Sequence, residues 1–322
     1  MRAVSAMSIA AALLFASPLP GQENQTAQEP TVGTAEPRSR TIVPSHPNMS
    51  YGPYRRNVMD VWIAESDSPT PVLVSIHGGG FRGGDKSVPR GLLRECLARG
   101  ISVAAITYRL TDEVIAPTPF LDAARAVQYI RSRSTEWKLD PSRVAATGSS
   151  AGAGISLWLG FHDDLADPTN ADPVLRQSSR LSCMAVTEGQ SSYDPRFIRK
   201  LFPEFEVYKH PALGFLYGVD LNQLDQLQDE KYRLFEEASP LTYLSNDDPP
   251  VLLLYRSRME TEISDVRIGI HHPRFGQELK QLMDALDLSC RVETGVPPEG
   301  GRSTQLIIEF LEEHLRPQRD EP

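Results

Sequence analysis

The amino-acid sequence predicts an α/β fold with a mostly parallel central sheet and helices on both faces. From Tyr54 onward, apolar runs of four to seven residues alternate with stretches of helical periodicity, which is typical of such sheets. The chain of 322 residues is also long enough to bury a sizeable core. In sheets of this kind, ligands bind at the carboxyl ends of the strands. We therefore expect the functional residues in the loops that follow the strands.

The predicted strands are short apolar segments, several of them bounded by turn-forming residues. The first is entered through Pro71 and ends at three consecutive glycines, and the third follows a turn at Asp140-Pro141. In chain order, the predicted strands cover residues 72–76, 101–107, 144–147, 183–187, 251–255 and 290–293.

The predicted helices lie between these strands and after the last one. Residues 92–99 read as a helix closed by Gly100, small residues open another at 151–159, and residues 304–315 form the closing helix. A further helix is indicated by apolar residues at helical spacing, namely Phe120, Leu121, Ala124, Val127 and Ile130. Residues 193–248 break the alternation and read as an insertion between two strands, in a position to roof a pocket.

The first residues predict export. Arg2 precedes an apolar run over residues 9–16 and then small residues, a pattern typical of a secretory signal peptide over residues 1–21. The alternative is a disordered start, because Arg2 is the only positive charge there. Residues 22–50 read as a flexible leader, and residues 51–322 as the folded domain. We expect a periplasmic or secreted protein without a membrane span.

Composition excludes several classes of function. The net charge of −9 and the lack of a dominant basic run argue against nucleic acid or an anionic membrane as the main partner. Cys96, Cys183 and Cys290 lie far apart in apolar stretches, so we expect buried thiols and neither a disulfide framework nor a zinc site. No metal and no organic cofactor is expected, and the sequence leaves the oligomeric state open.

The most informative motif is Gly148-Ser149-Ser150-Ala151-Gly152, which fits the pattern G-x-S-x-G. The motif follows a predicted strand and opens a predicted helix, the setting in which a nucleophilic serine is held on a sharp turn. Glycines flank such a serine because larger side chains would clash where the chain turns. The sequence therefore predicts Ser150 as a nucleophile.

A second motif, His77-Gly78-Gly79-Gly80-Phe81, leaves the first predicted strand. A glycine run lets backbone N–H groups approach a bound ligand and matches the oxyanion loop of lipases and esterases. His77 itself is expected to brace the loop. A phosphate-binding loop is not indicated, because Asp85 stands where the P-loop pattern requires lysine.

Together, HGGGF and GSSAG, with LDAARAVQYIR and LDPSRVAATG between them, resemble the α/β-hydrolases of the esterase/lipase type. The resemblance covers roughly residues 55–317 and is most specific in the first half. It implies a serine esterase with Ser150 as nucleophile and the N–H groups of Gly79, Gly80 and Ala151 as the oxyanion hole.

The second half departs from that family. Glu260 stands within a residue of the position of the family's acid, with Asp265 as the alternative. The family's histidine lies before the closing helix, but residues 294–302 contain none and His314 is too far along that helix. His271 and His272 offer a replacement, and the sequence does not choose between them.

The function predicted is hydrolysis of small-molecule or carbohydrate esters through an acyl-enzyme on Ser150, with His271 or His272 as base and Glu260 as acid. The alternative is a catalytically silent binding protein that keeps the fold but lacks the usual histidine.

Overall fold

The computed structural model describes residues 41–298 and 300–316, and its compact unit begins at Ile42. The predicted signal peptide, and the predicted leader up to residue 40, lie outside the described residues. The leader was predicted to reach residue 50, and this boundary is wrong because strand β1 occupies His46–Ser50. β1 is mostly exposed and polar, so its sequence lacks the apolar pattern that marks the buried strands. Among the described residues, no helix is long and apolar enough to cross a membrane.

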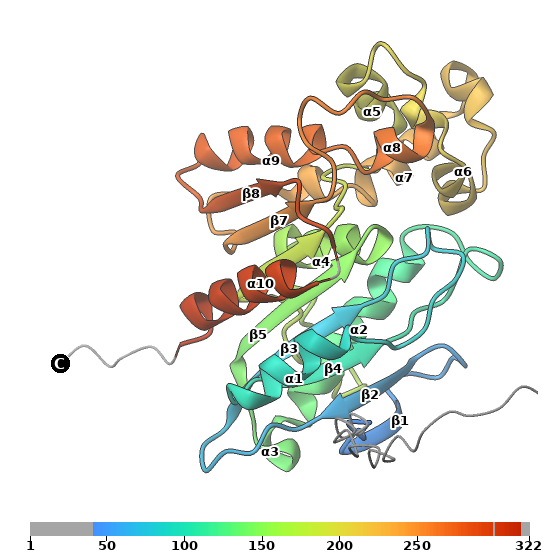
Figure 1. Cartoon of the computed structure of the whole chain (residues 1–322). Coiled ribbons are helices and arrows are strands. Elements are labelled where there is room, and N and C mark those ends of the chain that lie inside the picture. The colour runs from blue at the N-terminus through green and yellow to red at the C-terminus, as the bar shows by residue number, and fades with distance from the viewer. Residues whose placement is uncertain (1–40, 299, 317–322) are drawn as a thin grey trace, which may run out of the picture. The chain divides into compact units, whose positions relative to one another are not determined.

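Within the described residues, one sheet of eight strands has the order β1-β2-β4-β3-β5-β6-β7-β8 (Figure 1). β2 (Val58–Trp62) is antiparallel to β1 and β4, and the strands from β4 to β8 are parallel. The remaining strands are β3 (Thr70–Ile76), β4 (Ser102–Ile106), β5 (Leu139–Ser149), β6 (Cys183–Thr187), β7 (Val251–Tyr255) and β8 (Cys290–Thr294). The predicted α/β fold with a mostly parallel sheet is confirmed.

Helices cover both faces of the sheet (Figure 1). α1 (Arg90–Ala98) and α10 (Gly301–His314) pack on one face, and α2 (Thr118–Ser132), α4 (Ala151–Phe161) and α9 (Arg274–Asp284) pack on the other. A short α3 (Ser134–Trp137) precedes β5. Successive strand residues point to opposite faces, so Val251 and Leu253 enter one core while Leu252 enters the other. The central strands β3, β4, β6 and β7 are therefore buried at every position.

The segment predicted as an insertion holds short helices between β6 and β7. They are α5 (Pro195–Leu201), η1 (Val207–Lys209), α6 (Pro211–Tyr217), η2 (Leu221–Gln226), α7 (Asp229–Glu237) and η3 (Pro240–Tyr243). α8 (Val266–Ile270) follows β7. Figure 1 shows α5, α6, α7 and α8 grouped beyond the carboxyl ends of the strands. This group provides side chains at the edge of the sheet where the sequence places the chemistry.

Candidate active site

Ser150 occupies a strained turn between β5 and α4. Its backbone has φ 54° and ψ −118°, a conformation that is uncommon for a residue with a side chain. Both flanking glycines are required by space. A Cβ on Gly148 would lie 2.4 Å from the carbonyl carbon of Gly152, and one on Gly152 would lie 2.1 Å from the carbonyl oxygen of Ile76. The Ser150 N–H donates to the carbonyl of Thr187 at 3.0 Å, which ties the turn to the end of β6.

His271 faces this serine. The distance between Ser150 Oγ and His271 Nε2 is 2.9 Å, and both residues are partly exposed, so a small molecule can reach them. His271 directly follows α8, whose first N–H groups are capped by the Asp265 carboxylate at 2.7 and 3.0 Å. Burial lowers the pKa of His271, and a hydrogen bond with the backbone of Arg267 opposes that shift. The imidazole is therefore neutral at pH 7 and able to accept a proton.

His272, the neighbouring histidine, has a different environment. Its ring is fully buried, with Nε2 3.2 Å from the carbonyl of Thr261 and Nδ1 accepting from the Arg274 N–H at 3.2 Å. It also packs edge-on against Phe202. Nε2 thus contacts the loop before α8 and Nδ1 the start of α9, so both ring nitrogens are already engaged. Of the two histidines predicted as candidate bases, His271 is therefore the one that contacts Ser150.

The predicted acid does not join the pair. Glu260 is exposed, and in the described part of the chain it makes no hydrogen bond or ion pair, because the loop after β7 carries it into solvent. Asp265, the alternative, caps α8 instead. No carboxylate among the described residues hydrogen-bonds to His271. The structure therefore does not bring Glu260, the predicted acid, into contact with His271.

A partly buried carboxyl that the sequence did not single out lies at the end of β6. Glu188 has a positive φ of 55°, and its Oε1 accepts from the Arg256 N–H at 2.6 Å. Burial raises the pKa of Glu188. This carboxyl joins the ends of β6 and β7 and is not a partner of the histidine.

The glycine loop lies beside the serine. Gly79 and Gly80 have φ of 102° and 60°, so the loop turns in a way that favours glycine. A Cβ on Gly78 would lie 2.5 Å from the carbonyl oxygen of Ser149, so the loop touches the serine turn directly. In the described chain, the N–H groups of Gly79, Gly80 and Ala151 are not used in any backbone hydrogen bond. These donors are free to bind a ligand.

His77 braces this loop from below. Its ring lies 2.7 Å from the carbonyl of Gly78 and 3.2 Å from the Arg56 guanidinium. It also stacks on Tyr108 with a centroid distance of 4.3 Å. Burial lowers the pKa of His77. These contacts fit a structural role.

A fourth histidine near the site, His210, was not among the site residues that the sequence predicted. It caps the start of α6, where Nδ1 accepts from the Ala212 N–H at 3.3 Å. Burial, together with the neighbouring His271 and Arg267, lowers the pKa of His210 to about 4. A Cβ on Gly80 would lie 3.2 Å from the Ala212 Cβ, so the start of α6 contacts the glycine loop. His210 also lines a groove of about 530 Å³ with Phe215.

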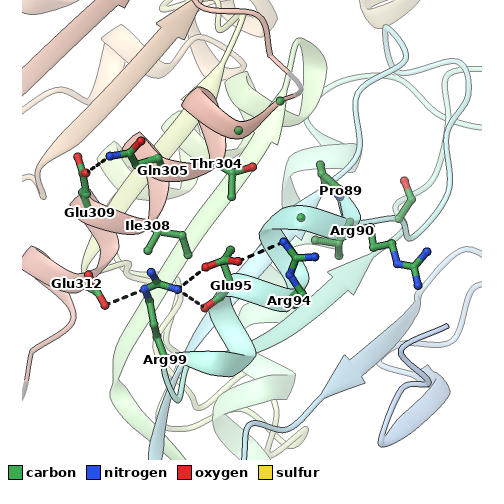
Figure 2. Close-up of a pocket in the computed structure, with 15 residues that line it drawn as sticks. Pro89, Arg90, Arg94, Glu95, Arg99, Thr304, Gln305, Ile308, Glu309 and Glu312 are labelled. Carbon is green, nitrogen blue, oxygen red and sulfur yellow. Dashed lines mark hydrogen bonds and ion pairs between the residues drawn. The ribbon is translucent and has the colours of Figure 1, made fainter. Parts of the chain in front are cut away.

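A cavity in the described part of the chain lies away from the serine. It measures about 970 Å³ and lies between α1 and α10, on the opposite face of the sheet from α4. Figure 2 shows Arg99 in this cavity, paired with Glu95 and Glu312. Neither Ser150 nor His271 lines it. This cavity is therefore separate from the serine and its histidine.

A serine on a strand–helix turn, an imidazole in contact with it and a glycine loop beside it, all at the carboxyl edge of a mostly parallel sheet, define the α/β-hydrolase class. The family model of BD-FAE matches residues 59–258, which is more than half of the chain. The chain therefore belongs to the BD-FAE family.

Curated relatives with sequence similarity have esterase names. A probable carboxylic ester hydrolase, LipM, from Mycobacterium tuberculosis is 28% identical over 65% of this chain and 46% of its own length. The esterase LipC of the same organism is 26% identical, over 65% of this chain and 49% of its own. The chain thus spans about half the length of the curated relatives it matches.

Solved structures of esterases share the fold. An acetyl ester-xyloside bifunctional hydrolase from Caldicellulosiruptor lactoaceticus has a TM-score of 0.66 and 19% identity, over 85% of this chain and 98% of that one. A thermophilic esterase from Thermogutta terrifontis has a TM-score of 0.58 and 18% identity, over 86% and 97%. At this identity the likeness establishes the α/β-hydrolase fold alone.

Proposed function

We propose that this chain is a carboxylic ester hydrolase that works through a covalent acyl-enzyme on Ser150. The contact of 2.9 Å between Ser150 Oγ and His271 Nε2 carries the proposal. A serine hydroxyl is a weak nucleophile at neutral pH unless an adjacent base takes its proton. His271 is neutral there because burial lowers its pKa, so it is ready to act as that base.

The reaction uses these groups in order. Ser150 Oγ bonds to the ester carbonyl carbon while its proton passes to His271 Nε2. The negative charge that develops on the carbonyl oxygen is received by the free N–H groups of Gly79, Gly80 and Ala151, each contributing about 3 kcal/mol to the transition state. Collapse of this intermediate breaks the bond to the alcohol, which leaves with the proton from His271. Water then repeats the two steps and releases the acid.

The substrate class proposed is a small-molecule or carbohydrate ester. The relatives and structural neighbours include carboxylic ester hydrolases and an acetyl ester-xyloside hydrolase. Partly exposed Ser150 and His271 suit a substrate of modest size. Esters with short acyl groups, such as acetate esters, are therefore the first substrates to test.

Steady-state hydrolysis of p-nitrophenyl acetate tests the proposal. Wild type is compared with Ser150→Ala and His271→Ala, and each substitution should reduce kcat by roughly 10³-fold or more, because members of a working catalytic unit cannot replace one another. If wild type is no faster than Ser150→Ala on acetate and longer esters, the serine is silent. The chain would then be a binding protein with this fold.

Export is also proposed, on the strength of the apolar run at residues 9–16 and the small residues that follow it. Fractionation of cells that express the full chain should find the protein outside the cytoplasm. Deletion of residues 2–21 should retain it inside. If the full chain and the chain without residues 2–21 are found in the same cell fraction, export is contradicted.

A further inference from the structure

Gln190 is a buried amide that holds the backbone next to His271. It lies in the loop after β6 and is 2% exposed. Its Nε2 donates to the carbonyl of Ile270 at 2.7 Å and to that of Glu188 at 2.9 Å. Ile270 is the last residue of α8 and directly precedes His271. One side chain thus fastens the end of α8 to the end of β6.

The other end of the same amide is linked to the helix that follows the serine. The Tyr193 hydroxyl donates to Gln190 Oε1 at 3.2 Å. Tyr193 packs closely on α4, because a Cβ on Gly154 would lie 2.0 Å from its hydroxyl oxygen. The Gly154 N–H in turn donates to the carbonyl of Ser150 at 3.0 Å. A continuous set of buried contacts therefore joins the turn that carries Ser150 to the turn that carries His271.

This connection occurs where an acid is missing. In a serine–histidine–acid triad, the carboxylate orients the imidazole and stabilises its charged form. Here no described carboxylate hydrogen-bonds to His271, and the Gln190 amide donates to the carbonyl of the residue directly before it. A neutral amide can orient but adds no negative charge.

We propose that Gln190 is a positioning residue that keeps His271 Nε2 facing Ser150 Oγ and so performs the orienting part of the acid's role. The inference rests on the proposed function, because it concerns the same serine and histidine. Loss of the amide leaves the Ile270 carbonyl buried without its donor and frees the end of α8 to shift. A displacement of about 1 Å at reacting groups is enough to cost roughly 10²-fold in rate.

The test compares Gln190→Met with Gln128→Met. Gln128 is a matched control, because it is also a buried amide, 1% exposed, and its Nε2 donates to the carbonyl of Gln177 at 2.8 Å, away from the serine. Both variants lose a buried hydrogen bond and should lose similar stability. Below the melting temperature of both, Gln190→Met should show kcat reduced by about 10²-fold with KM nearly unchanged. Gln128→Met should keep kcat within about twofold of wild type.

A second readout follows the serine directly. The rate at which a fluorophosphonate labels Ser150 should fall in Gln190→Met in parallel with kcat, and it should not fall in Gln128→Met. If Gln190→Met does not fold, Tyr193→Phe decides, since it removes only the hydroxyl that holds Gln190 Oε1 and should lower kcat several-fold at constant KM.

The outcomes separate the two proposals. A wild-type protein without Ser150-dependent hydrolysis or labelling would overturn both the proposed function and the role of Gln190. The positioning role alone would be overturned if wild type is active and Gln190→Met is no slower than Gln128→Met. Where Gln190→Met does not fold, the same comparison is made with Tyr193→Phe.

Discussion

Replacing Glu260 by alanine separates a serine–histidine pair from a triad. Removing the carboxylate of a working triad costs about 10⁴-fold in kcat, or roughly 5.4 kcal/mol at 1.36 kcal/mol per factor of ten. In this structure the Glu260 side chain is exposed and makes no hydrogen bond or ion pair within the described residues. A surface substitution of that kind changes the free energy of unfolding by no more than about 0.5 kcal/mol. We therefore expect kcat of Glu260→Ala to lie within about twofold of wild type.

The assay is hydrolysis of p-nitrophenyl acetate at saturating substrate, with the melting temperature of each protein measured in the same buffer. The two expectations for kcat differ by more than a thousandfold, so moderate errors in enzyme concentration do not matter. His271→Ala, measured beside it, gives the size of a true catalytic loss. A loss in Glu260→Ala that approaches the loss in His271→Ala would refute the geometry described for the loop after β7.

Three further predictions follow from the same site. Because burial lowers the pKa of His271, this base stays neutral to below pH 6.5. The acid limb of a plot of kcat/KM against pH should therefore have its midpoint below pH 6.5, and a midpoint above that pH would contradict the described environment of His271. Burial also lowers the pKa of His77, His210 and His272, and that of His210 falls to about 4. The unfolded chain therefore binds more protons than the folded chain below pH 6.5, so the folded state is most stable above that pH. The melting temperature should fall as the pH drops from 6.5 toward 4, and an unchanged melting temperature over this range would contradict the described burial of these histidines. Gly152→Ala places a Cβ 2.1 Å from the carbonyl oxygen of Ile76. Thermal unfolding should therefore show a free energy of unfolding lower by about 1–3 kcal/mol, and ester hydrolysis should be lost. A variant as stable as wild type would show that the turn relaxes.

The sheet and the serine turn were predictable because their residues act locally. The apolar strand runs and the glycines beside Ser150 are needed for reasons that the sequence itself displays, and β3 and β6 fall at or near the predicted ranges. β5 is longer than predicted, spanning Leu139–Ser149 rather than 144–147, because its first part is polar and only partly buried. Residues 193–248 were predicted only as an insertion, although Asp194-Pro195 and His210-Pro211 begin α5 and α6 with the proline at a position that suits a helix start.

The partners of the serine were less predictable because they depend on the paths of loops. His271 and His272 are neighbours, yet at the end of α8 their side chains diverge, one to Ser150 and the other to the carbonyl of Thr261. Glu260 has the expected place in the sequence, but its loop leads outward. Gln190 gave no motif signal, and its importance arises from hydrogen bonds to residues far along the chain.

The most direct test of the account is the reaction of Ser150 with a fluorophosphonate, followed by the mass of the intact protein and of its peptides. The central claim is that Ser150 is a nucleophile activated by His271. It predicts one covalent adduct on the peptide that contains Ser150, no adduct in Ser150→Ala, and labelling slowed by roughly 10³-fold in His271→Ala. Absence of the adduct in wild type, or equal labelling rates in wild type and His271→Ala, would contradict the claim.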